Sequence, residues 1–123
     1  MEQVFTLPIH VTGTLAANVS FRWTVPFDCQ LIHVAAVGSN ANDATVEVGT
    51  SADTDGYLVA SAVGDSGTPN EYGRSSFTGA LLTDSGQFPH LTDGTILAVV
   101  VDFDGAAGTA VQNLTVVLTL TKG

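Results

Sequence analysis

Basic side chains are scarce in this sequence. Arg22, Arg74 and Lys122 face twelve aspartate and glutamate residues, so the net charge at pH 7 is −9. Binding to nucleic acid depends on cations that displace the counterions of the phosphate backbone. The charge balance therefore argues against DNA or RNA as a partner.

Cysteine and long apolar runs are also scarce. Cys29 is the single cysteine, so an intrachain disulfide is excluded, and its apolar neighbours predict a small buried hydrophobe rather than a nucleophile. No apolar run approaches the roughly 20 residues that a membrane helix needs. The N-terminal sequence MEQVFTLPIH lacks the basic region of a signal peptide. We expect a soluble, unprocessed chain with no membrane partner.

Motifs for catalysis or for transition metals are missing as well. The chain has no Gly-x-Ser-x-Gly sequence, and His10, His33 and His90 form neither a His-x-His nor a His-x3-His pair. Aspartate and glutamate residues mostly lie beside Gly, Ser or Thr, where carboxylates accept hydrogen bonds from turn backbones. We therefore predict a protein that is not an enzyme, with no catalytic residue and no cofactor.

The turn Asp53-Thr54-Asp55-Gly56 resembles the start of a calcium loop, but it does not continue as one. An EF-hand loop that began at Asp53 would need an oxygen ligand and then a glycine where this chain has Tyr57 and Leu58. The simpler interpretation is a tight turn, and we predict no metal site.

What the chain does contain is strand periodicity. Apolar and polar residues alternate in several short segments, and no segment shows sustained helical periodicity. At 123 residues the chain is predicted to form one domain, residues 1–123, folded as an all-β antiparallel β-sandwich of jelly-roll type. The predicted strands cover residues 4–11, 19–25, 29–37, 44–48, 95–102 and 114–121. The predicted core includes Phe21, Trp23, Val46, Val48, Val100, Leu114, Val116 and Leu118.

Some local features of this prediction are more specific. Pro8 lacks an N–H, so the first strand is expected to lie at a sheet edge or to pair on one side only at that position. Residues 12–14 are expected to turn the chain, and Gly49 to end the fourth strand. Residues 29–37 carry apolar side chains at both parities, which predicts a strand covered on both faces. A short helical turn between Gly56 and Val63 is an open alternative.

The longest and most distinctive loop region runs from Asn40 to Gly67. Long ordered loops in compact domains often carry function. Tyr57 and Tyr72 lie in polar insertions and are candidate contact residues. Trp23 shares a face with Phe21 and Val25, which favours burial over stacking on a sugar.

Two stretches resemble the small decoration proteins, also called cement or head auxiliary proteins, of tailed bacteriophages. One is Val25-Pro26-Phe27-Asp28-Cys29 followed by a strand. The other runs from Asn42 to Tyr57, where a strand passes through Gly-Thr-Ser into an acidic turn. The Thr/Val-alternating strand from Leu114 to Thr121 fits the same pattern. The resemblance covers about half of the chain and does not extend to residues 68–90.

This resemblance implies a non-catalytic structural protein of the virion. Such a protein would be assembled in the host cytoplasm, would bind the capsid exterior and would bridge major capsid protein subunits, often as a homotrimer at three-fold positions. A neighbouring alternative is a carbohydrate- or receptor-binding β-sandwich module of a phage fibre.

The composition agrees with a protein that associates. With 12% charged and 45% hydrophobic residues, the chain exposes few charges for a free monomer, so we expect a partner to cover part of its surface. The N-terminal segment, residues 1–8, is a candidate docking arm, and an ordinary edge strand is the equal alternative. The candidate contact residues for capsid or subunit are Val4, Phe5, Pro8, Tyr57 and Tyr72.

Overall fold

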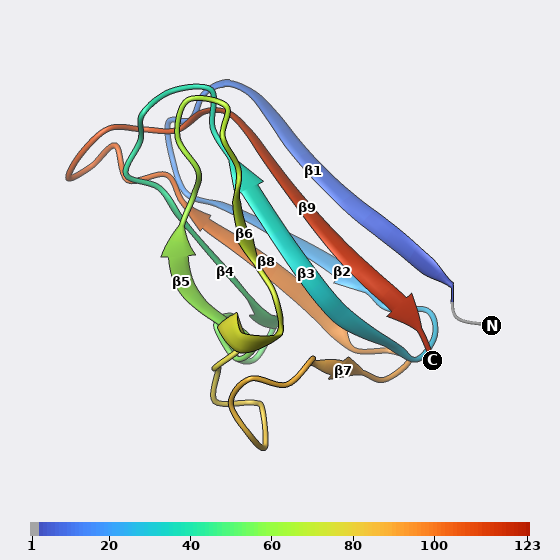
Figure 1. Cartoon of the computed structure of the whole chain (residues 1–123). Helices are drawn as coiled ribbons and strands as arrows, with labels where there is room; N and C mark the ends of the chain where they lie inside the picture. Colours follow the sequence, from blue (N-terminus) through green and yellow to red (C-terminus); the bar gives the residue numbers. More distant parts are fainter. Residues whose placement is uncertain (1–2) are drawn as a thin grey trace.

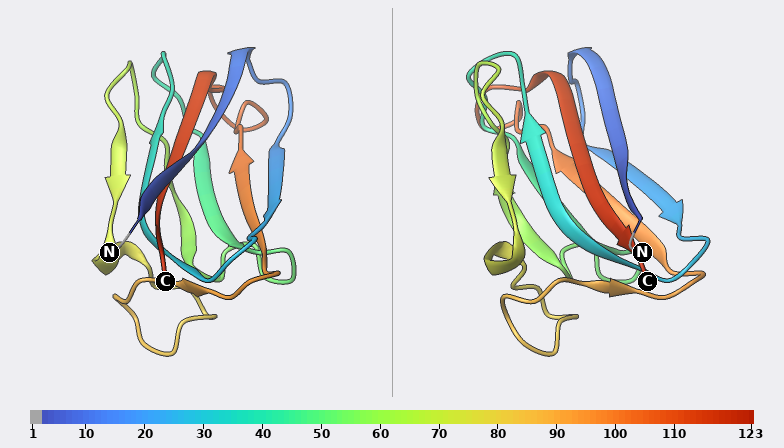
Figure 2. Two further views of the ribbon diagram at one scale, coloured as in Figure 1. Left: turned by 90° about the vertical axis from the view of Figure 1, so that its right-hand side faces the viewer. Right: turned by 45° about the vertical axis from the view of Figure 1, so that its right-hand side comes forward.

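Two antiparallel sheets pack face to face in the computed structural model, which describes residues 3–123 (Figure 1). The first sheet has the strand order β1 (Val4–Thr14), β9 (Gln112–Lys122), β3 (Cys29–Val37), β6 (Asn70–Tyr72), and β7 (His90–Leu91) also pairs with β3. The second sheet has the order β2 (Val19–Thr24), β8 (Ile96–Asp102), β4 (Thr45–Thr50), β5 (Leu58–Ala62). Figure 2 shows the two layers from the side.

The pairing between strands is nested along the chain. β1 pairs with β9, β2 with β8, β3 with β6, and β4 with β5. This is the order that results when one long antiparallel ribbon is rolled into two sheets, which is the jelly roll. The predicted fold class is confirmed: an all-β single domain built as an antiparallel sandwich.

The core lies between the sheets and follows the alternation of the strands. Along β9, Leu114, Val116, Leu118 and Leu120 are fully buried, and the residues between them lie on the outer face. Of the predicted core, Val46, Val48, Leu114, Val116 and Leu118 are 0% exposed, whereas Phe21 and Trp23 are half-buried and pack against it.

The prediction for Val100 is wrong. In β8 the buried inner positions are Leu97, Val99 and Val101, so Val100 lies on the outer face and is only half-buried. The run Ile96 to Val101 is apolar at every position, so it contains no alternation that could set its register.

The mixed parity of β3 has a different cause from the one expected. Cys29 and Leu31 are buried at the start of the strand, and Val34 and Ala36 are buried farther on. The register against β9 shifts between Leu31 and His33. Such a β-bulge inserts one extra residue, which reverses the parity of everything after it. The strand therefore keeps one fully buried face.

Two expected boundaries and one open alternative are also corrected. Residues 12–14 do not turn the chain, because β1 continues to Thr14 through a register shift in which Gly13 has a φ of 87°. Gly49 does not end β4, which runs to Thr50. Residues 58–62 form strand β5 and not a helical turn, since they pair with β4.

Residues 68–90, to which the resemblance does not extend, first run beside β3 as β6 and then close the lower end of the sandwich in Figure 1. They contain β6, a 3-10 helix at Arg74–Ser76 and the fully buried Phe77, and they lead into β7. Among residues 3–123, no helix is long and apolar enough to cross a membrane.

Candidate binding surface

Three of the candidate contact residues lie on β1. Val4, Phe5 and Pro8 pair with Thr121, Leu120 and Val117 of β9, so residues 4–8 belong to the first sheet. Val4 is 61% exposed, and Phe5 turns inward and is half-buried. Met1 and Glu2 of the proposed arm lie outside the described residues.

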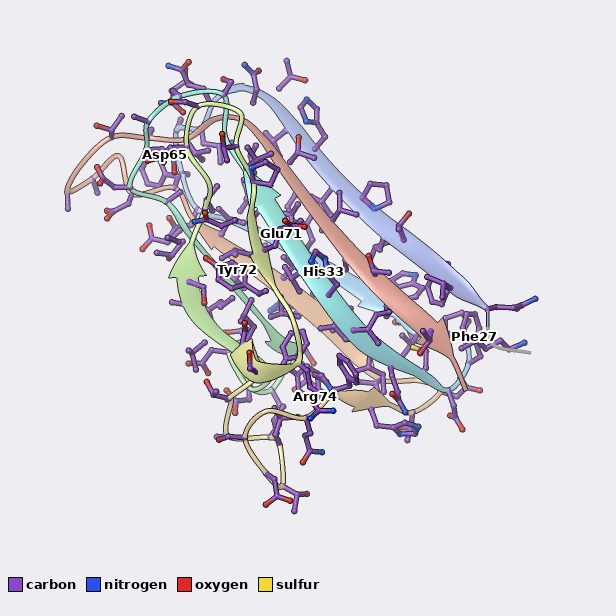
Figure 3. The ribbon with its side chains drawn as sticks, viewed as in Figure 1. Phe27, His33, Asp65, Glu71, Tyr72 and Arg74 are labelled. Carbon is purple, nitrogen blue, oxygen red and sulfur yellow. The ribbon has the colours of Figure 1, made fainter. Side chains whose placement is uncertain are left out.

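The other two candidates lie elsewhere. Tyr57 is 7% exposed and belongs to the core, so it offers little surface to a partner. Burial also raises the pKa of its phenol. Tyr72 lies on β6, at the opposite side of the first sheet from β1 (Figure 3). The structure therefore does not bring the five candidates together in one site.

One side of the sandwich has two free strand edges. Within residues 3–123, β1 pairs only with β9 and β2 pairs only with β8, so each strand ends its sheet (Figure 1). A free edge exposes backbone N–H and C=O groups that another strand can pair with. We call this side, formed by β1 and β2, the open edge.

An apolar groove lies at the open edge. It has a volume of about 190 Å³. Its lining comes from both sheets: Leu7, Ile9, Phe21, Arg22, Trp23, Leu97 and Val99. In a fully closed sandwich the inward-facing Leu7, Phe21 and Trp23 would be buried, but here each is half-buried.

An aromatic cluster continues this apolar surface toward the lower end. The Phe5 ring meets Trp23 edge to face, with centroids 6.2 Å apart, and meets Phe27 in the same way at 5.5 Å. The ammonium of Lys122 lies 5.4 Å from the centroid of Phe27. These contacts join β1 to β2 and to the turn after β2, and they place a cation beside the apolar surface.

The opposite side of the sandwich is closed by hydrogen bonds between the sheets. Tyr72 Oη and Asn70 Nδ2, both on β6, donate to the carbonyl oxygen of Ala62 on β5. Farther along, the Gly64 N–H donates to the carbonyl of Ala36 at 2.9 Å. The two sides of the sandwich therefore differ. Hydrogen bonds join the sheets on the side of β5 and β6, whereas the open edge contains a groove.

The open edge differs from the rest of the molecule in the sign of its charged side chains. Two of the three basic residues in the chain, Arg22 and Lys122, lie beside it, and residues 4–14 and 19–24 contain no carboxylate. Arg22 is exposed and donates to the Ser20 hydroxyl at 3.1 Å. Within the described part of the chain, no carboxylate forms an ion pair with it.

The acidic turn after β4 is stabilised by its own backbone. The carbonyl of Asp53 accepts from the N–H groups of Thr50 and Gly56, and Thr54 Oγ1 donates to Glu47 at 2.8 Å. A side-chain hydrogen bond with Asp55, partial burial and the charge of Asp55 raise the pKa of Asp53. A carboxyl whose pKa is raised on folding destabilises the folded state once it ionises.

Replacing Asp55 with asparagine should therefore stabilise the protein at neutral pH. In the folded protein the pKa of Asp53 lies above its unfolded value, so the favourable contribution is complete at low pH and is lost as pH rises through the folded pKa. We expect D55N to raise Tm at pH 7 and to leave it unchanged near pH 3. Asp84→Asn changes the net charge equally at a distant loop, and an equal gain in D84N would contradict this account.

The histidines and Cys29 have ordinary structural surroundings in the described residues. Between residues 3 and 123, no three His, Cys, Asp or Glu side chains are grouped so as to hold a metal ion. His33 pairs with Glu71 at 3.4 Å, and His10 hydrogen-bonds Thr115 at 2.8 Å. Cys29 is 0% exposed, and burial, together with the charge of Asp28, raises its thiol pKa.

Polar residues of the Asn40–Gly67 region hold the loops at the upper end of the sandwich together. Asn40 Nδ2 donates to the carbonyl of Ala110 at 2.9 Å. Asp43 accepts from the Thr109 N–H at 2.7 Å. Asp65, labelled in Figure 3, accepts from the Asn42 N–H at 3.2 Å. These carboxylates satisfy backbone donors, which agrees with the turn chemistry expected from the sequence.

The open edge is the feature that sequence reasoning missed. Phe21 and Trp23 alternate correctly as inward residues, and that alternation says nothing about whether a second sheet covers them fully. Pro8 was the one available signal, since it placed the first strand at an edge. That β2 is also an edge, on the same side, follows only from the strand order.

Comparison with protein-family models and with curated proteins gives no match. Comparison with solved structures gives a chain described as the cyanophage Pam1 capsid asymmetric unit. It superposes with a TM-score of 0.54 at 18% identity, over 99% of this chain and 85% of that chain. At this identity the likeness shows that the two chains share a fold over nearly the whole length of this protein.

Proposed function

We propose that this protein is a structural, non-catalytic component of a tailed-phage capsid. In this proposal it is a decoration protein that binds the capsid exterior and bridges major capsid protein subunits. The observation that carries the proposal is the fold shared with a chain of a phage capsid asymmetric unit over 99% of this sequence. The resemblance of residues 25–29 and 42–57 to decoration proteins supports it independently.

The surface of the first sheet suits such a role. On its outer face, β9 presents Thr115, Val117, Thr119 and Thr121. Within β1, β3, β6, β7 and β9, Glu71 is the one carboxylate, although the chain carries a net charge of −9. Most acidic residues lie instead in the loops at the two ends. A broad face with few charges can be covered by a partner at a small desolvation cost.

Assembly as a homo-oligomer would strengthen binding to a symmetric shell. We propose a trimer at three-fold positions, because symmetry repeats each weak contact and raises the effective concentration of the remaining copies once one has bound. A single copy then needs only modest affinity.

Reconstitution on particles tests the proposed function. We expect the purified chain to co-sediment with particles assembled from the major capsid protein of the same genome and to add external density at three-fold positions in cryo-electron microscopy. Decorated particles should also resist heat better than bare particles. Absence of co-sedimentation would contradict the proposal, and binding to a glycan array in its place would favour the fibre-module alternative.

A further inference from the structure

The open edge has the features of a site that receives a strand. β2 has a free side, and its inward residues Phe21 and Trp23 line the groove that a neighbouring strand would cover. When a peptide adds to a free sheet edge, main-chain hydrogen bonds supply affinity and its alternate side chains enter pockets that give specificity. At the open edge, the free backbone N–H and C=O groups of β2 lie beside the apolar groove.

β2 is better suited than β1 to accept such a strand. Pro8 lies in the middle of β1 and supplies no N–H, which interrupts pairing along an edge. Residues 19–24 contain no proline. β2 therefore offers an unbroken set of backbone groups along its free side.

The charge beside the groove indicates the chemistry of the occupant. Arg22 lies on the outward face of β2 between the inward Phe21 and Trp23, and within residues 3–123 it contacts a serine hydroxyl and no carboxylate. Lys122 lies beside Phe27 at the lower end of the same side. A strand with apolar inward residues and a carboxylate facing Arg22 would match both the groove and the charge.

We propose that the open edge of β2 receives an extended segment of the capsid protein, with apolar side chains in the groove and a carboxylate on Arg22. This inference rests on the proposed function and names the part of the partner that is bound. It also changes the role expected for the N-terminal region: β1 forms one wall of a receiving groove, and Phe5 buttresses Trp23.

Two variants test the charge and the groove separately. Arg22→Glu reverses the charge beside β2, and Leu7→Phe fills part of the groove. We expect each to weaken binding to the particles by about tenfold or more, because a facing carboxylate would meet repulsion in the first and the apolar side chains would lose space in the second. Both should keep the Tm of the wild type, since Arg22 is exposed and Leu7 is only half-buried.

Matched controls make the same chemical changes elsewhere. Arg74→Glu reverses the other arginine, in the 3-10 helix, and Val59→Phe enlarges an exposed residue of β5. We expect both to bind as the wild type does. Equal binding by all four variants would overturn the groove assignment and leave the proposed function intact, whereas failure of the wild type to bind would overturn both.

Hydrogen exchange on the decorated particle tests strand addition directly. We expect slower exchange of the β2 amides when the protein is bound, because a new strand would pair with its free edge. Protection confined to β5, β6 or the outer face of the first sheet would overturn the assignment, even if the protein binds.

Discussion

Replacing Leu118 with alanine is expected to lower the free energy of unfolding by about 2–5 kcal/mol. Leu118 is 0% exposed at the centre of β9, where it pairs with Leu7 of β1 and Val34 of β3. Truncation removes buried apolar surface and leaves a cavity that a strand fixed on both sides cannot close. Urea unfolding followed by circular dichroism measures the loss, with an unchanged m-value as the sign of two-state behaviour.

Val117→Ala is the matched control for this experiment. Val117 lies next along the same strand but faces outward and is half-buried. We expect V117A to lower the free energy of unfolding by at most about 1 kcal/mol, since the substitution removes only packing on a partly solvated face. Equal costs at the two positions would mean that the register of β9 is not the one described.

Replacing Gly79 with alanine should destabilise the protein by roughly 3 kcal/mol, near the upper end for a group forced into a packed site. A Cβ at Gly79 would collide with the backbone of Gly56 and with the Tyr57 nitrogen. The two segments are hydrogen-bonded, Gly79 N to Tyr57 O at 3.1 Å and Leu81 N to Gly56 O at 3.0 Å. Backbone cannot move aside as a flexible side chain can, so these bonds must lengthen or break.

Gly73→Ala provides the comparison within the same loop. A Cβ at Gly73 meets nothing within 4 Å, and its φ is −118°. We expect its free energy of unfolding to stay within about 0.5 kcal/mol of the wild type. If G79A were as stable as G73A, the close approach of residues 56–57 and 79–81 would not exist in solution.

These two predictions concern different levels of the fold. The Leu118 variant tests the core packing of β9, a strand whose buried face can be predicted from its alternating sequence. Gly79 tests a contact between the turn after β4 and a loop more than twenty residues farther along the chain, in the region to which the resemblance does not extend. Their outcomes therefore report separately on the sandwich core and on the lower end of the molecule.

Strands whose two faces differ chemically could be predicted from the sequence. In β9 the leucines and Val116 alternate with threonines and Val117, so burying one face fixes both strand and register. The fold class, the edge position implied by Pro8 and the structural use of turn carboxylates were readable for similar local reasons. So was the burial of Cys29.

Tertiary structure decided the features that depend on a neighbour. The β3 bulge is visible only in the pairing with β9. In β8 the residues from Ile96 to Val101 are apolar on both faces, so the register of neither strand can be inferred from its own sequence. Tyr57 is a core residue although it lies in a polar insertion of the sequence, and its backbone is hydrogen-bonded to Gly79, more than twenty residues farther along the chain. The open edge arises because β1 and β2 end their sheets on the same side of the sandwich. The residue pattern of one strand cannot show whether the other sheet covers its inward side chains.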